Sequence, residues 1–180
     1  RHEVINSIGL FSVFDTDIIR HADVHTGGFS AKYGGRISSI MDITTRDGNK
    51  RESNIKLSVS PFQSKALFEG PIKKQTDSTA SSSSFIISAK HSLLEQSSKV
   101  LYDYVNEDGL PFNYTDIYGK FSINGKDGSK INFFGFNFDD NVLYQNVSEY
   151  DWTNTGAGTN FVVVPENSNI LMEGNFAYSK

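Results

Sequence analysis

The side chains that could do chemistry in this chain are few and widely spaced. His21 and His25 have the i, i+4 spacing that suits a metal ion on one face of a helix, but their segment reads as strand or loop and no third ligand is near. Asp15 and Asp17 could bind Ca²⁺, although an aspartate in this position more often caps the segment that begins at Ile18. Neither pair is predicted to hold a metal ion.

Other groups with chemical potential lead to the same conclusion. Asp139, Asp140 and the stretch 103–108 could bind Ca²⁺ in loops, but solvated loops are favoured. The absence of cysteine excludes a disulfide scaffold, a cysteine-ligated zinc site and a thiol nucleophile. No nucleophile elbow, phosphate-binding loop or paired-carboxylate motif is present. The sequence therefore predicts a protein that is not an enzyme and that carries no cofactor.

Composition favours strands. The 180 residues include 17 Lys and Arg against 21 Asp and Glu, a net charge of −4 that argues against nucleic-acid binding. Aromatic residues make up 13%, with 14 Phe and 8 Tyr, and the rest is rich in Asn, Ser and Gly. This mixture favours half-buried strands and polar loops, and no helix is expected after residue 49. No apolar run approaches the ~18 residues of a membrane helix. Because the chain begins at Arg1, it is expected to be processed or truncated.

Alternation of apolar and polar residues dominates the chain after residue 49. It predicts about seven antiparallel strands of roughly 8–11 residues between 55 and 179. One set of connections is compact, namely 73–83, 125–129 and 165–169. The other set holds two long loops that are aromatic and acidic, 97–115 and 139–153. Short turns at one end and long loops at the other are typical of transmembrane β-barrels.

Alternation alone does not decide what the apolar face contacts. In a β-sandwich it packs in a shared core, whereas in a membrane barrel it faces lipid and the opposite face is polar. Three features favour lipid. The polar faces carry mid-strand charged and amide residues, which are Lys56, Glu69, Lys90, Lys120, Asn124, Glu173 and Asn175. Aromatic residues near strand ends suggest interfacial girdles, at Tyr102, Tyr104, Phe112, Tyr114, Tyr118, Tyr144, Tyr150, Trp152 and Tyr178. The loops, finally, are long and polar.

A family resemblance adds to this pattern. Residues 18–49, IIRHADVHTGGFSAKYGGRISSIMDITTRDGN, resemble the end of the plug domain of TonB-dependent outer-membrane receptors, whose motif is matched at Val24, Gly28, Tyr33, Gly34, Gly35, Ile40, Ile43, Thr44, Thr45 and Arg46. The stretch 27–49 resembles the Bacteroidetes type in particular. Later pieces, such as EGPIKK, DIYGKFSINGKDGSK and EGNFAYSK, resemble the first barrel strands. One departure is that Arg36-Ile37-Ser38-Ser39 stands where the family usually has glycines.

The resemblance implies an all-β fold: an antiparallel meander of about seven strands from a large transmembrane β-barrel, preceded by the end of a plug domain. Residues 1–49 would be the C-terminal part of the plug, and residues 50–180 the first strands of an incomplete barrel. Such plugged transporters have about 22 strands, so the chain is expected to be a fragment. The plug motif comprises Gly27, Gly28, Tyr33, Gly34, Gly35 and Arg36, where glycine would allow sharp turns against the barrel wall.

The implied function is import of a nutrient across the bacterial outer membrane. The implied partners are a TonB-like energy-coupling protein, outer-membrane lipids, the nutrient ligand and, as a further candidate, a surface lipoprotein. The family pairs plug arginines with wall glutamates, which suggests ion pairs between Arg36 and Glu69, Glu95 or Glu173. The alternative is a secreted β-sandwich, adhesive or carbohydrate-binding, in which loops 97–115 and 139–153 carry recognition.

Overall fold

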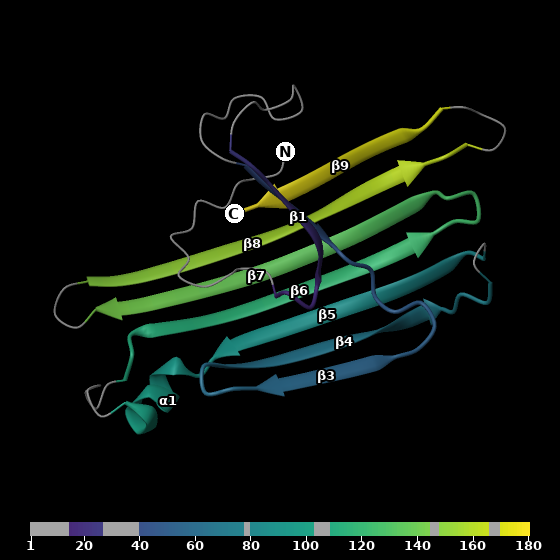
Figure 1. Cartoon of the computed structure of the whole chain (residues 1–180). Coiled ribbons are helices and arrows are strands. Elements are labelled where there is room, and N and C mark those ends of the chain that lie inside the picture. Colours follow the sequence, from purple (N-terminus) through teal and green to yellow (C-terminus); the bar gives the residue numbers. More distant parts are fainter. Residues whose placement is uncertain (1–14, 27–39, 78–79, 103–108, 145–147, 166–169) are drawn as a thin grey trace. The chain divides into compact units, whose positions relative to one another are not determined.

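The computed structural model describes residues 15–26, 40–77, 80–102, 109–144, 148–165 and 170–180 (Figure 1). The chain divides between Arg46 and Asp47 into two compact units. In the first unit, β1 (Ile19–His25) pairs antiparallel with β2 (Ile40–Thr45). The segment before β1 is a turn, in which an oxygen of the Asp15 carboxylate accepts a hydrogen bond from the Asp17 amide at 2.7 Å. Asp15 therefore caps a turn and binds the backbone.

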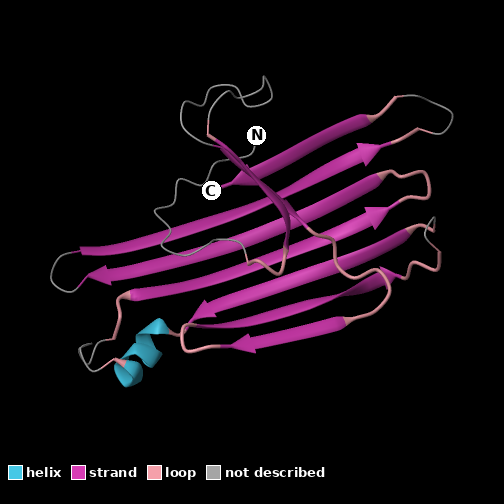
Figure 2. Cartoon of the chain, in the orientation of Figure 1, coloured by secondary structure: helices cyan, strands magenta, loops and turns pink. Residues whose placement is uncertain are grey.

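The second unit contains a seven-stranded antiparallel sheet in which each strand pairs with the next along the chain (Figure 2). Its strands are β3 (Asn54–Val59), β4 (Gln63–Lys73), β5 (Ser82–Ser92), β6 (Phe112–Asn124), β7 (Lys130–Tyr144), β8 (Ser148–Val163) and β9 (Met172–Ser179). The predicted meander of about seven strands is confirmed. The turn between β6 and β7 is tight, as expected from GKDGS, with the Gly125 amide bonded to the Ser129 carbonyl at 2.8 Å and Gly128 at a positive φ of 87°.

Two predictions about the connections are wrong. The stretch 97–115 was expected to be a loop, but a helix, α1 (Leu94–Leu101), forms in this connection. It buries Leu94 and Ser98 on one side, and Glu95 lies one turn before Lys99 with 3.9 Å between their charged atoms. The stretch 139–153 was also expected to be a loop, yet β7 runs to Tyr144 and β8 begins at Ser148. No helix in the part of the chain that the structure describes is long and apolar enough to cross a membrane.

The β7–β8 hairpin extends because polar pairs continue its ladder. The Asn141 amide donates to the Asp151 carboxylate across the two strands. Trp152 pairs with Asp140 and Tyr150 with Val142, and aromatic and branched residues favour extended backbone. Hydrophobic alternation fades here while the strand pairing persists, so this part of the hairpin escaped a pattern-based prediction.

The two faces of the seven-stranded sheet differ in burial. We call one the polar face. By the strand register it holds every buried side chain that the structure describes in the sheet, which are Leu67, Glu69, Ser82, Ser84, Ile86, Ser88, Lys90, Ser92, Tyr114, Asp116, Tyr118, Lys120, Ser122, Asn132 and Phe138. The apolar face holds large side chains that are exposed, namely Ile55, Leu57, Val59, Phe68, Ile72, Ile87, Ile117, Ile123, Ile131, Phe133, Met172, Phe176 and Tyr178. This arrangement is the reverse of a sheet that buries its apolar side in a core.

The prediction of an aromatic girdle on the apolar face is mostly wrong. Tyr114 and Tyr118 are buried on the polar face, and the register places Tyr150 and Trp152 on that same side. Of the residues assigned to the girdle whose side chains the structure describes in the sheet, Tyr178 alone lies on the apolar face. Phenylalanines cross the apolar face instead, in the contacts Phe68–Phe85, Phe121–Phe133 and Phe161–Phe176.

Candidate functional site

The segment that leads into β3 crosses the polar face of the sheet. Gly48 lies so close to β5 that a Cβ atom there would be 1.9 Å from the carbonyl oxygen of Phe85. The Asn49 amide donates to the Glu69 carboxylate on β4 at 2.9 Å, and the Lys50 carbonyl accepts from the Gln75 amide at 3.0 Å. Residues 47–50, which we call the crossing segment, are therefore fixed to strands far away in sequence. Only glycine permits this approach at position 48.

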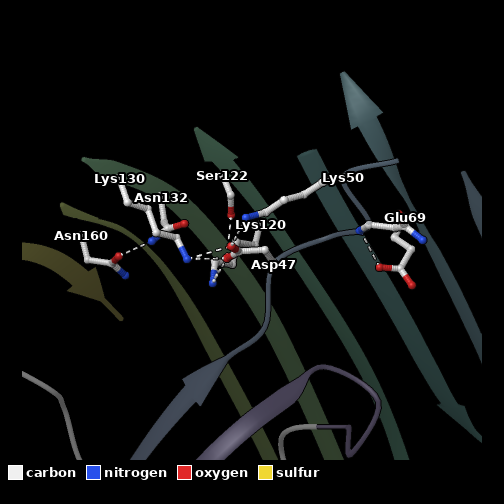
Figure 3. A network of polar contacts seen from close by, with 9 residues as sticks. Asp47, Lys50, Glu69, Lys120, Ser122, Lys130, Asn132 and Asn160 are labelled. Carbon is white, nitrogen blue, oxygen red and sulfur yellow. Dashed lines mark hydrogen bonds and ion pairs between the residues drawn. The ribbon is translucent and has the colours of Figure 1, made fainter. Parts of the chain in front are cut away.

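The crossing segment begins at a carboxylate surrounded by lysines (Figure 3). Lys130 Nζ lies 2.8 Å from both Asp47 oxygens, and Lys120 Nζ lies 3.2 Å from Oδ1. The Ser122 hydroxyl donates to Asp47 Oδ1 at 3.2 Å, and Lys50 Nζ is 3.8 Å from Oδ2. We call these five residues the Asp47 cluster. Strands β6 and β7 supply Lys120, Ser122 and Lys130, so the cluster joins the chain entering the sheet to two strands of its middle.

Burial makes these contacts strong. The side chains of Lys120 and Asp47 are 5% and 13% exposed, so water screens their attraction little. Burial by itself raises the pKa of the Asp47 carboxyl, but the hydrogen bonds and positive charges of Lys130 and Lys120 outweigh that effect and hold the pKa below its usual 3.8. The carboxylate is thus ionised at neutral pH and stabilised by its neighbours.

The depressed pKa predicts an acid-dependent stability. A carboxyl whose folded pKa lies below its unfolded value contributes stability above the unfolded pKa, and that contribution is lost as the pH falls through the folded pKa. The stability difference between the native chain and Asp47→Asn should therefore be constant above about pH 5 and shrink below about pH 4. Urea unfolding at a series of pH values measures it. A difference that stays constant down to pH 2.5 would contradict the assignment of this titration to Asp47.

A second buried ion pair lies on the polar face. Lys90 Nζ on β5 lies 2.8 Å from Asp116 Oδ2 on β6 and 5.1 Å from the centre of the Tyr114 ring. The Tyr114 hydroxyl donates to the Gln63 side chain at 2.8 Å. The ion pair links β5 to β6 and the Tyr114 hydrogen bond links β6 to β4, so these side chains connect three strands on this face.

The residues expected to form ion pairs between plug and wall lie in different parts of the chain. Arg36 lies outside the described residues, as do the other positions of the motif, Gly27, Gly28, Tyr33, Gly34 and Gly35. Glu69 is buried on the polar face, where it accepts the Asn49 amide. Glu173 belongs to the same face by register and is exposed. Glu95 lies in the first turn of α1, outside the sheet.

The histidines and aspartates weighed as metal ligands are not gathered into a site. His21 and His25 lie on β1, where His21 Nε2 is 2.8 Å from Asp23 Oδ2. Asp139 and Asp140 are consecutive residues of β7, so their side chains point to opposite faces. Within the described ranges, no group of three or more histidine, cysteine or acidic residues could hold a metal ion.

Reasoning from the sequence missed the Asp47 cluster. The sequence pattern gives no role to Asp47 or Gly48, and it identifies Lys120 only as a polar mid-strand residue. A usable signal existed, because lysine inside a long strand requires an anion nearby or a hydrated surface.

Comparisons of the chain with protein-family models, curated proteins and solved structures found no match.

Proposed function

We propose that this chain is part of a TonB-dependent outer-membrane receptor of the Bacteroidetes type, which imports a nutrient across the bacterial outer membrane. In this proposal, the first unit is the end of the plug domain and the seven strands are the first part of the barrel wall. The observation that carries the proposal is the inverted sheet, whose apolar face is exposed while the face rich in serine, lysine and acidic residues is buried.

Energetics favour a lipid environment for this sheet. Leu57, Val59 and Phe176 are 73%, 78% and 69% exposed, and ten other large apolar side chains on the same face are exposed by more than a third. Moving one such side chain out of water is worth about 1.5–3 kcal/mol when burial is complete. The whole face therefore forfeits on the order of 10 kcal/mol or more in water, which is comparable with the stability of an entire domain. Acyl chains would remove this penalty.

The sandwich alternative fits these features less well. A sandwich requires a second sheet of similar width to cover the apolar face. Apart from the seven-stranded sheet, the described residues form one sheet, and it has only the two strands β1 and β2. A sandwich core would also have to include the exposed apolar face. It would leave Lys90, Asp116 and Lys120 on the solvent-exposed face, whereas these three are buried.

The sheet edges and the crossing segment also support the proposal. Among the described residues, β3 and β9 each pair with one strand, and a barrel would continue both edges with further strands. The Asp47 cluster would be the anchor where the chain passes from plug to wall. Ligand capture by outer loops and rearrangement of the plug by a TonB-like partner would follow from membership of this family.

Flotation with lipid vesicles tests the proposal. The chain, refolded from denaturant with phosphatidylcholine vesicles, should float with the lipid. Phe133→Arg places a charge on the apolar face and should weaken incorporation by about 2–4 kcal/mol, at least tenfold. Asn175→Arg is the matched control, because Asn175 lies on the polar face of β9, and it should float like the native chain. A native chain that remains a soluble monomer without lipid would reject the proposal and favour the sandwich.

A further inference from the structure

Partway along the strands, the apolar face becomes polar. The change occurs at one level, meaning one row of residues that pair with each other across neighbouring strands. His91, Thr115, Asp139 and Thr153 lie directly opposite one another across β5, β6, β7 and β8, and Ser64 on β4 faces His91. The next level toward the β7–β8 turn is formed by Asn113, Asn141 and Asp151. These two polar rows contain no large apolar side chain. The edge strand β3 departs from the pattern, since Val59 lies opposite Ser64.

Side chains in and next to these rows are bonded to one another. His91 Nδ1 lies 2.9 Å from the Thr115 hydroxyl oxygen, and the Asn137 amide donates to Asp139 at 2.5 Å. The Asn141 amide donates to the Asp151 carboxylate. The rows thus place hydrogen-bonding groups on four strands, with side-chain bonds between β5 and β6, within β7, and between β7 and β8. Such a surface gains nothing from contact with hydrocarbon.

Below the polar rows, the same face is apolar over three successive levels. The middle level carries Phe85, Phe121, Phe133 and Phe176, with Thr159 among them. The levels on either side carry Ile87, Ala157 and Tyr178, and Ile123, Ile131 and Phe161. Ala89 and Ile117 share a level with Asn137 and Thr155, so the change from apolar to polar takes place at that row.

We propose that the row of His91, Thr115, Asp139 and Thr153 lies at the lipid headgroups, with acyl chains covering the three apolar levels and the β7–β8 hairpin projecting beyond the bilayer. This inference rests on the proposed function and deepens it by placing the wall in the membrane. The partner of the polar rows is then the hydrated headgroup layer of the adjacent leaflet.

The distance from the polar row to the β6–β7 turn agrees with this placement. From Thr115 to the start of the turn at Gly125, the chain advances roughly 34 Å at ~3.4 Å per residue. At a strand tilt of ~40°, that length projects to about 26 Å, close to the apolar band of ~25 Å in outer-membrane barrels. Beyond Asp139, β7 continues to Tyr144 and pairs with β8 from Ser148, which adds roughly 17 Å of ribbon outside the band.

Depth-dependent fluorescence quenching tests the placement. The chain contains no cysteine, so single cysteines at chosen positions can carry the fluorophore NBD without a background. We choose Phe133→Cys, Ile117→Cys and Asp151→Cys on the apolar face, with Ser88→Cys on the polar face as the matched control. Each labelled chain is placed in phosphatidylcholine vesicles whose lipids carry a doxyl quencher at acyl carbon 5 or carbon 12.

The expected pattern is graded. NBD at position 133 should lose about half its emission or more with the deep quencher, and NBD at position 117 should respond best to the shallow one. Positions 151 and 88 should keep their emission. Quenching at 151 as deep as at 133, or its absence at 117, would overturn the placement while leaving the membrane assignment intact. Absence of quenching at both 133 and 117 would instead reject the proposed function.

Discussion

Replacing Gly48 with alanine is expected to cost about 3 kcal/mol or more of folding stability, because the new methyl group would lie 1.9 Å from the Phe85 carbonyl oxygen. The obstacle is backbone, 2.5 Å away at the Phe85 carbonyl carbon, so no side chain can swing aside to make room. The crossing segment would have to lift from the sheet, and the bond from the Asn49 amide to Glu69 would break. Urea unfolding in detergent measures the loss.

Gly119→Ala provides the matched control for this prediction. Gly119 lies in β6, and a Cβ atom there would have no other heavy atom within 4 Å. Its substitution should change stability by no more than about 0.5 kcal/mol, with a small gain expected in a strand. Hydrogen exchange at the Asn49 amide gives a local readout, which should accelerate in Gly48→Ala alone. Equal stabilities for the two variants would show that the crossing segment does not lie against β5.

The sheet was predictable because alternation survives wherever one face is uniformly apolar. Ile55, Leu57 and Val59 determine the orientation of β3 without any knowledge of its neighbours. Successive alternating segments joined by short turns then favour an antiparallel meander. Which face would be buried did not follow from the pattern, since period 2 is the same in a sandwich and in a barrel wall.

The parts that escaped prediction depend on long-range contacts. Asp47 meets Lys130 across 83 residues, and no local rule couples these two positions. In the sequence, Gly48 is indistinguishable from a glycine in an ordinary turn. Its close approach to the Phe85 carbonyl is defined only in the folded sheet. In α1, Leu94 and Ser98 are buried on one side of a short segment whose composition resembles a polar loop. Contacts of this kind are defined by the folded sheet as a whole.

For the aromatic residues, the rule that tyrosines near strand ends mark a membrane interface assigned several side chains to the wrong face of the sheet. Tyrosines near strand ends are typical of membrane interfaces, yet Tyr114 bonds to Gln63 and packs beside Lys90 on the polar face. Facing aromatics also fill space beside glycines, as Phe136 does over Gly156 and Phe161 over Gly174. Position near a strand end did not reveal the side to which each ring points, whereas the register did.

Replacing Asp47 with alanine is expected to cost about 3 kcal/mol, because Lys120 would remain almost fully buried beside Lys130 without the carboxylate that now lies between them. Asp47→Asn should cost less, since an amide oxygen still accepts from Ser122 and the lysines. Lys50→Ala is the control within the same cluster. Its ammonium group is 3.8 Å from Asp47 and its side chain is 31% exposed, so its loss should cost no more than about 1 kcal/mol.

A double-mutant cycle separates the ion pair from simple loss of packing. If the cost of Asp47→Ala arises from an uncompensated ammonium group, adding Lys120→Met should recover about 1–2 kcal/mol, because methionine fills similar volume without charge. Unfolding in urea, followed by the fluorescence of the single tryptophan, Trp152, gives the four free energies. Strictly additive costs would mean that Asp47 and Lys120 act independently, and the anchor would then reside in the backbone contacts of Gly48 and Asn49.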